Sequence, residues 1–517
     1  MEKQSLIKGT AILGMAGIFA KFLGLFFRWP LIMLIGDEGV GYYQMSYPLY
    51  MFFIAIASGV PVAISKLVSE RKAIGDNHGI IQVFRKSMLL MIILGGGFTG
   101  IILALSKKLI IFFRWDWKAY YSLIGIAIAP IFISIMSAFR GFFQGLQNMN
   151  PTAVSQIIEQ VGRVIFGIGL AFILLPRGIE YAAGGAAFGA AAGGILGGVY
   201  LLFKYCSVRQ RISIGKVKDN VDILTRLIYI SVPISLGATV GSVMSLIDSA
   251  LVPQKLLQAG FDYKEATILY GQLTGKAFVL VNVPLTISMA LCASIVPIIA
   301  ECYILNRKYE LVGKVHLAIK FSMVIGIPSF LGLYFLALPV MQLLFPGHSE
   351  GFEILKYSSI SIPFIVISQT TTAILQGVGR YIRPVINLMI GCIIKTMLTI
   401  ILVPIPNINI YGAVIGSICG YLIAALLNMK VLRKTLNISI NYYNILVKPL
   451  YASVLMIISV LVIYSYTYNY TLSNIIACLA AVFSGILIYS ILIIVMRIFS
   501  YDYFKNKLLK YKRRGIK

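Results

Sequence analysis

The sequence predicts an all-α polytopic membrane protein with about fourteen transmembrane helices: two pseudo-symmetric six-helix lobes around a central cavity, plus two C-terminal helices. Three observations predict this fold: an apolar composition, a series of long apolar runs and an internal repeat. Of the 517 residues, 59% are hydrophobic and 12% are charged, and the mean hydropathy is +0.89. A soluble domain carries about 25% charged residues, so this chain lacks the polar surface to face water on all sides.

The apolar runs are long enough to cross a bilayer, which takes about 20 mainly apolar residues. They are separated by charges or by turn-forming residues, such as the Gly-Asp-Glu-Gly sequence at 36–39. The predicted spans are 6–35, 42–65, 84–105, 119–143, 152–175, 182–203, 227–252, 267–300, 317–345, 354–377, 385–404, 411–429, 449–467 and 471–496.

The basic residues predict the orientation of these spans. With the N-terminus in the cytoplasm, most of the 45 Lys and Arg residues fall on the cytoplasmic side, including those of 204–226, 307–320, 430–448 and 505–517. Both termini are then cytoplasmic. The net charge of +27 is explained by topology and by contact with anionic lipid, so we expect no nucleic-acid partner.

An internal repeat pairs predicted helices 2 with 8, 4 with 10, 5 with 11 and 6 with 12. For example, Gln144-Gly145 before Pro151 resembles Gln376-Gly377 before Pro384. Because each half has an even number of spans, the repeat is parallel, and substrate is expected between the halves. The predicted divisions are an N-lobe (1–205), a basic linker (206–226), a C-lobe (227–434), helices 13 and 14 (435–497) and a basic tail (498–517).

Glycine recurs every fourth residue in predicted helix 6. This spacing places Gly185, Gly189, Gly193 and Gly197 on one helix face, which favours close helix packing. No GxxxxGK[ST] sequence occurs, so no ATP site is expected.

Seven ionisable residues stand out within the predicted spans, where charge is costly and typically faces a cavity or a partner. Glu159 and Arg163 are four residues apart and can pair, so a structural and a functional role both stay open. Asp248 could balance a cation or bind a coupling cation. The seven are Lys21, Arg28, Glu159, Arg163, Asp248, Lys276 and Lys395.

The excess of cations among these residues suits an anionic substrate such as a phosphate or pyrophosphate group. An exporter of organic cations would be expected to show the opposite sign. The loops contain no DxD, no HxxxH and no Ser-His-Asp candidates, so we expect a transporter rather than an enzyme, with no cofactor and no metal site.

Several stretches carry a family resemblance. Residues 59–70 (GVPVAISKLVSE) resemble the stage V sporulation protein B group, in the polysaccharide transporter branch of the multidrug/oligosaccharidyl-lipid/polysaccharide exporter superfamily. The resemblance extends nearly end to end. It continues in 140–149, 157–160, 233–237, 246–249 and 270–275.

The resemblance implies fourteen helices in two lobes, a V-shaped central cavity and movement of undecaprenyl-pyrophosphate-linked sugars. The MurJ-type flippases of this superfamily move lipid II, the peptidoglycan precursor. Their helix 1 carries two cavity arginines: Lys21 matches the first, and Arg28 falls about one residue beyond the second. Their last two helices form a groove for the lipid tail, a role implied here for 449–496.

Two departures from the MurJ-type pattern concern helices 2 and 8. The helix 8 cation of that group aligns near Val279, one turn from Lys276, and the aspartate early in its helix 2 is replaced here by Tyr42 or Tyr43. These departures bear on how the substrate is held.

These inferences together predict a flippase that moves an undecaprenyl-pyrophosphate-linked oligosaccharide, foremost lipid II, to the outer leaflet by alternating access. It would work in a bacterial cytoplasmic membrane during cell-wall or spore synthesis, as a monomer, with membrane lipids and cell-wall synthesis proteins as partners. Asp248 and Glu159 would bind a coupling ion or balance charge. The alternatives are a cation-coupled multidrug or metabolite exporter of the same superfamily and a scaffold for envelope assembly. The expected substrate-binding residues are Lys21, Arg28, Lys276, Lys395 and Arg163.

Overall fold

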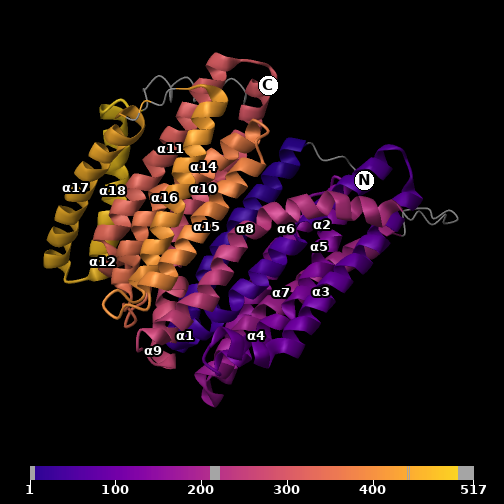
Figure 1. The fold of residues 1–517 in the computed structure, drawn as a ribbon, viewed down its shortest axis with the longest axis horizontal. Coiled ribbons are helices and arrows are strands. Elements are labelled where there is room, and N and C mark those ends of the chain that lie inside the picture. The colour runs from indigo at the N-terminus through magenta and orange to yellow at the C-terminus, as the bar shows by residue number, and fades with distance from the viewer. Residues whose placement is uncertain (1–5, 210–221, 439–440, 442, 499–517) are drawn as a thin grey trace. The chain divides into compact units, whose positions relative to one another are not determined.

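The structure is a computed structural model that describes residues 6–209, 222–438, 441 and 443–498. Within these ranges the side chains of 6–14, 18, 21, 25, 222, 237, 240 and 293 lie outside the description. The described residues form helices and no strand (Figure 1). The chain divides into two compact units, 1–275 and 276–517. The all-helical membrane fold predicted from the sequence is confirmed.

The first unit contains the elements up to α9. They are α1 (Leu6–Ala57), α2 (Gly59–Ala73), α3 (Asn77–Phe113), α4 (Ala119–Ala127), α5 (Ala129–Gly145), α6 (Asn150–Leu174), η1 (Leu175–Arg177), α7 (Ile179–Arg209), α8 (Asp222–Gln258) and α9 (Tyr263–Gly271).

A short π-helical segment, η2 (Gln272–Ala277), leads into the second unit. The elements that follow are α10 (Phe278–Ile304), α11 (Lys308–Phe335), α12 (Ala337–Leu344), α13 (Phe352–Ser358), η3 (Ser359–Ser361), α14 (Ile362–Gly377), α15 (Ile382–Leu402), α16 (Tyr411–Leu436), η4 (Tyr443–Val447), α17 (Lys448–Thr471) and α18 (Asn474–Val495).

Helix α1 reverses direction at Gly36, whose φ of 62° lies outside the helical region. Glycine adopts a positive φ without the Cβ clash that other residues meet. The guanidinium carbon of Arg28 lies 5.4 Å from the Tyr43 ring centroid, whereas residues 28 and 43 of a straight helix would be about 22 Å apart. The first arm of α1 (6–35) and its second arm (37–57) are therefore separate segments that fold back on each other.

Twelve helices in the described part of the chain are long and apolar enough to cross a membrane. The number rises to thirteen if α8, bent by 59° between Leu236 and Gly241, counts as one span. The continuous stretch Met15–Ala73 counts once in this total, although it contains the reversal at Gly36. The fourteen predicted ranges all fall largely on helical residues, and the number fourteen stays a prediction.

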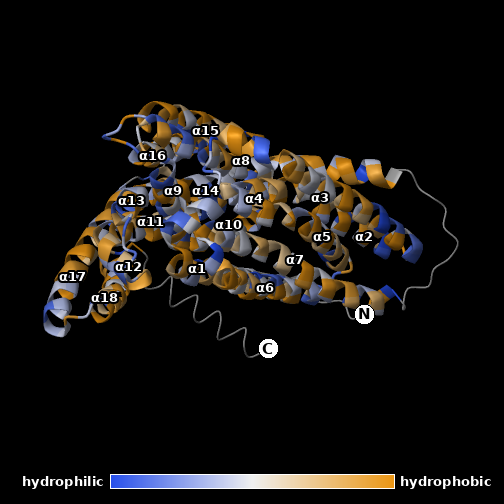
Figure 2. Cartoon of the chain, turned by 90° about the horizontal axis from the view of Figure 1, so that it is seen from below, coloured by the Kyte–Doolittle hydropathy of each residue, from blue (hydrophilic) through white to orange (hydrophobic). Residues whose placement is uncertain are grey.

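Pairs of helices that pack along each other in the first unit have counterparts in the second unit. In the first unit α6 packs along α7 and α3 along α5, while in the second unit α15 packs along α16 and α11 along α14. These pairs correspond to predicted helices 5–6, 3–4, 11–12 and 9–10, in agreement with the predicted repeat. Helices α17 and α18 pack on each other at the yellow end of the chain (Figure 1). Figure 2 shows that hydrophobic residues predominate along the helices.

Close packing of α6 on α7 depends on the glycines of α7. A Cβ atom on Gly193 would collide with the carbonyl oxygen of Glu159, and one on Gly189 would lie 2.9 Å from the carbonyl oxygen of Arg163. The close helix packing predicted from the glycine spacing is confirmed. Because Glu159 and Arg163 belong to α6, the glycine face of α7 also holds the backbone from which these two charged side chains project.

Candidate functional site

Arg28 and Lys21 both lie in the first arm of α1. The side chain of Lys21 is outside the described residues. The Arg28 guanidinium stacks 5.4 Å from the Tyr43 ring centroid and 5.6 Å from that of Tyr47. Its Nη1 atom is buried and has no hydrogen-bond partner among the described residues. A buried cationic donor without an acceptor is costly, so this atom is suited to an anionic ligand.

Three tyrosines form a ladder on the second arm of α1. Tyr43 stacks on Tyr47 with ring centroids 5.4 Å apart, and Tyr47 lies 5.7 Å from Tyr50. Their spacing of four and three residues places all three rings on one face of a helix. The ladder runs from Arg28 at one end to Arg163 at the other, because Arg163 contacts Tyr50.

Arg163 projects from α6 and is 8% exposed. Its Nη2 atom donates a hydrogen bond of 2.8 Å to the Tyr50 hydroxyl, and its guanidinium carbon lies 5.5 Å from the Tyr50 ring centroid. The Nε atom of Arg163 is buried without a hydrogen-bond partner among the described residues. Arg163 and Arg28 are thus alike: each guanidinium lies against an aromatic face and has one buried donor atom without a hydrogen-bond partner among the described residues.

Glu159 lies one turn from Arg163 on α6 and forms an ion pair with Arg140 of α5. The Arg140 Nη2 atom donates to the Glu159 carboxylate at 2.9 Å, and the Arg140 Nε atom donates to the Ser155 hydroxyl at 2.9 Å. Arg140 is not among the seven ionisable residues predicted to matter within the spans, although it lies within the predicted span 119–143. The rule that a buried acid needs a cation partner was the signal that could have identified it.

The charges near the tyrosine ladder do not cancel. Arg140 neutralises Glu159, which leaves the positive charges of Arg28 and Arg163. Guanidinium groups bind phosphate oxygens through paired N–H donors. The tyrosine ladder of the first unit is therefore flanked by two positively charged guanidiniums, a chemistry suited to phosphate.

Asp248 of α8 also belongs to the first unit and is 7% exposed. Its carboxylate lies close enough to the Tyr270 phenol for electrostatic interaction. Next to it, the Trp115 indole nitrogen donates to the carbonyl of Ser249 at 2.7 Å. The roles of Asp248 in binding a coupling ion or in balancing charge stay predictions.

Lys276 and Lys395 lie in the second unit. The ammonium of Lys276, which is fully buried, donates to the carbonyl oxygens of His348 at 2.7 Å and Glu350 at 3.3 Å and lies 5.8 Å from the Phe345 ring centroid. Lys395 is 5% exposed on α15 and faces α16, where a Cβ on Gly420 would lie 3.0 Å from its own Cβ. Their roles in substrate binding stay predictions.

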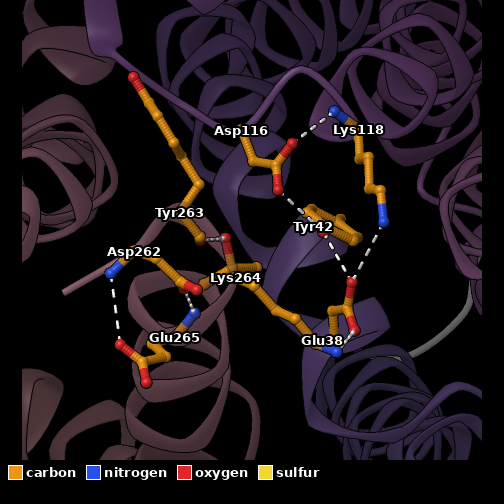
Figure 3. Close-up of polar contacts among 9 residues, drawn as sticks. Glu38, Tyr42, Asp116, Lys118, Asp262, Tyr263, Lys264 and Glu265 are labelled. Carbon is orange, nitrogen blue, oxygen red and sulfur yellow. Dashed lines mark hydrogen bonds and ion pairs between the residues drawn. The ribbon is translucent and has the colours of Figure 1, made fainter.

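A second polar cluster lies where α1 reverses. Figure 3 shows Tyr42 between two carboxylates: its hydroxyl is 2.9 Å from Glu38 and 3.0 Å from Asp116. A phenol carries one proton and donates to one carboxylate at a time. Lys118 and Lys264 each place an ammonium 3.6 Å from Glu38.

This cluster joins three segments of the first unit. Glu38 and Tyr42 belong to the second arm of α1, Asp116 and Lys118 to the loop before α4, and Lys264 to α9. Beside it, the Gln272 amide donates to the Asp37 carboxylate at 2.9 Å. The tyrosine that stands at the start of predicted helix 2 is thus part of an acid–base network.

The many membrane-spanning helices and the cationic interior define a polytopic membrane transporter. The chain belongs to the polysaccharide biosynthesis protein family, whose model matches residues 6–303. It is 32% identical over 451 residues to the stage V sporulation protein B of Bacillus subtilis (strain 168), covering 85% of this chain and 86% of that protein. It is 28% identical over 470 residues to the lipid II flippase MurJ of the same bacterium, covering 86% and 85%.

A solved structure of the same fold is that of a lipid II flippase MurJ in an inward closed conformation. Its TM-score is 0.70 at 14% identity, covering 96% of this chain and 100% of that one. At this identity the match establishes the fold. The relatives are transporters of the exporter superfamily, so the predicted family and the prediction of a transporter rather than an enzyme are confirmed. At the level of the family, the chain is a flippase-type transporter for lipid-linked saccharides.

Proposed function

We propose that this protein moves lipid II, or a closely similar undecaprenyl-pyrophosphate-linked oligosaccharide, from the inner to the outer leaflet of the cytoplasmic membrane. The observation that carries the proposal is the pair of guanidiniums of Arg28 and Arg163, each with a buried donor atom that has no hydrogen-bond partner among the described residues. Two such cations match the two phosphates of a pyrophosphate. The names of two relatives, a sporulation protein and a lipid II flippase, support the same substrate class.

In this proposal the pyrophosphate binds between Arg28 and Arg163, with Lys21 as a third contact in the first arm of α1. The tyrosine ladder holds both guanidinium planes, so less freedom is lost when the anion binds. The lipid chain stays in the bilayer, against α17 and α18, whose outer faces carry many exposed apolar side chains.

The orientation follows from the basic residues: both termini are proposed to be cytoplasmic. The reversal at Gly36 then lies on the outer side, and the cluster around Glu38 acts as an outer latch between α1 and α9. Transport requires alternating access, so this latch opens when the head group leaves. Glu38→Gln is expected to increase labelling of a cysteine placed at Val40, which is 1% exposed, by a membrane-impermeant thiol reagent in a cysteine-free background. Unchanged labelling would argue against the latch.

Rescue of a bacterial strain whose own lipid II flippase can be switched off tests the function. The protein, a Lys21→Ala/Arg28→Ala variant and a Lys434→Gln control would be expressed, with membrane levels matched and lipid II in the outer leaflet quantified. We expect rescue by the protein and by the control, whose lysine is exposed on α16, but not by the double variant. Rescue by the double variant would disprove the site. No rescue by the folded protein would indicate another lipid-linked saccharide or the exporter alternative.

A further inference from the structure

A pocket of about 330 Å³ lies in the second unit, where α11 meets the segment that leads into α17. None of the residues that line it is acidic, and two of them are a lysine and a histidine. The lining residues are Gly313, His316, Leu317, Lys320, Asn441, Asn444 and Ile445.

The basic groups of this pocket are held in place by backbone carbonyls. The Lys320 ammonium donates to the carbonyl of Ile498 at 2.7 Å, and the Nδ1 atom of His316 lies 3.0 Å from the carbonyl of Val312. A carbonyl can only accept, so Nδ1 carries the proton in this contact. The ammonium of Lys448, at the start of α17, is close enough to repel that of Lys320. This local excess of positive charge would be relieved by an anion.

The height of the pocket in the membrane follows from α17 and α18. These helices have 24 and 22 residues, which correspond to about 36 and 33 Å, enough for one crossing each. They are joined by two residues and pack on each other, so the start of α17 and the end of α18 lie at the same membrane surface. Because Lys320 contacts Ile498, three residues beyond α18, the pocket lies at that surface.

Aromatic residues mark the same level. Tyr443 and Tyr451 flank the start of α17 and are each 59% exposed. Tyrosines are enriched where the hydrocarbon of a membrane meets its head groups. The pocket therefore opens at the level of the phosphates of one leaflet, which is the cytoplasmic leaflet in the predicted orientation.

We propose that this pocket binds the phosphate of an anionic phospholipid from the adjoining leaflet. The Lys320 ammonium balances the charge of the phosphate, and the amides of Asn441 and Asn444 can donate to its oxygens. Leu317 and Ile445 contact the apolar part of the lipid next to the head group. A bound lipid would thus connect α11 to the segment that leads into α17, and so would hold the C-terminal helix pair against α11.

A substitution at Asn441 tests this site without disturbing the backbone. The Asn441 Oδ1 atom accepts a hydrogen bond from the Asn444 nitrogen at 3.2 Å, and an aspartate in its place can accept the same bond. Asn441→Asp therefore keeps the local fold and adds a negative charge at the rim of the pocket. Lys320→Gln is a second variant, and Lys434→Gln, on the exposed last turn of α16, is the matched control for loss of a surface charge.

The measurement is the thermal midpoint of the purified full-length protein in detergent, titrated with dioleoyl phosphatidylglycerol, dioleoyl phosphatidylcholine or inorganic phosphate. A ligand that binds the folded state raises this midpoint. We expect phosphatidylglycerol to raise the thermal midpoint at a concentration at least about tenfold lower than either of the other two probes requires. Asn441→Asp is expected to weaken the phosphatidylglycerol effect by about tenfold, which is the effect of about 1.4 kcal/mol, and Lys434→Gln is expected to leave it unchanged.

Three results would overturn the proposal. Equal phosphatidylglycerol effects in the protein and in both pocket variants would place the lipid elsewhere. If the phosphatidylglycerol effect on the thermal midpoint were weakened as much in Lys434→Gln as in Lys320→Gln, diffuse attraction of the lipid to surface charge, rather than a site, would be indicated. Inorganic phosphate as effective as phosphatidylglycerol would make this a site for a soluble phosphate.

Discussion

In the first unit, Arg28 and Arg163 lie against tyrosine rings, whereas in the second unit Lys276 donates directly to two backbone carbonyls. All three cations are at membrane depth by the sequence pattern. Only the two arginines have buried donor atoms without a partner among the described residues. A guanidinium can stack and still present in-plane donors, while an ammonium is a point charge that needs acceptors around it. In the proposed site, therefore, unmet donors and not burial distinguish the two arginines from Lys276.

The largest effect on stability is expected for removal of Glu159, the acidic partner of Arg140 in the first unit. Glu159→Gln leaves Arg140 without its carboxylate, and breaking a buried pair costs about 3 kcal/mol. We expect a clearly lower thermal midpoint in detergent. The double variant Arg140→Gln/Glu159→Gln should recover much of the loss, because no uncompensated charge is left. Equal stability of the single variant and the unchanged protein would show that this pair is not coupled.

Loss of the Arg28 guanidinium is expected to reduce transport with little loss of stability. A hydrogen bond to a charged group contributes about 1.5–3 kcal/mol, so Arg28→Ala should slow lipid II appearance in the outer leaflet by about 10- to 100-fold. The transport rate of Arg28→Lys should lie between those of the unchanged protein and Arg28→Ala, because lysine keeps the charge but lacks the planar set of donors. A normal rate for Arg28→Ala would remove this residue from the proposed site.

Lys276→Met is expected to show the opposite behaviour. Loss of the Lys276 ammonium leaves the carbonyls of His348 and Glu350 without this donor, which costs about 2 kcal/mol of the free energy of unfolding. Transport per folded molecule should change by less than about threefold, since 0.6 kcal/mol corresponds to that factor. A large loss of transport at unchanged thermal stability would instead place Lys276 at the substrate, as the sequence predicts, and would remove the contrast between the two units.

The smallest effect is expected for Tyr50→Phe. This change removes the hydroxyl that accepts from Arg163 but keeps the aromatic ring, at a cost of about 1 kcal/mol. Because Tyr50 positions Arg163, we expect about a fivefold loss of apparent affinity for lipid II, with the maximal rate retained. Tyr47→Phe is the matched control on the same helix face. No loss in either variant would mean that the ladder acts by packing alone. An equal loss in both would mean that the hydrogen bond from Arg163 to Tyr50 is not the cause.

Much of the fold could be predicted because membrane helices are encoded by local composition. The turn at Gly36, the glycine face of α7 and the long apolar runs each depend on neighbouring residues in the chain, and the structure places them as expected. The partners of buried charges could not be predicted in the same way. Arg140 meets Glu159 from 19 residues away, and Tyr50 meets Arg163 from 113 residues away, so these contacts depend on how helices pack.

Spacing on one helix was also an incomplete guide to charge pairing. Glu159 and Arg163 share a face of α6, which allowed a pair between them. The structure shows instead that Glu159 bonds to Arg140 and that Arg163 bonds to Tyr50. Tertiary contacts with planar, well-oriented partners supply better geometry than a neighbour four residues along a helix.

The contact between α6 and α7 bears on how this transporter can evolve. Gly193 and Gly189 touch the backbone at Glu159 and Arg163, so an added methyl group on α7 would shift α6 and displace a charge that it never contacts. Selection for substrate binding therefore acts on these two glycines as well, although they carry no polar side chain. A lineage that changed substrates could do so by altering these glycines while every charged residue stayed the same, and a comparison of charged positions alone would overlook the event.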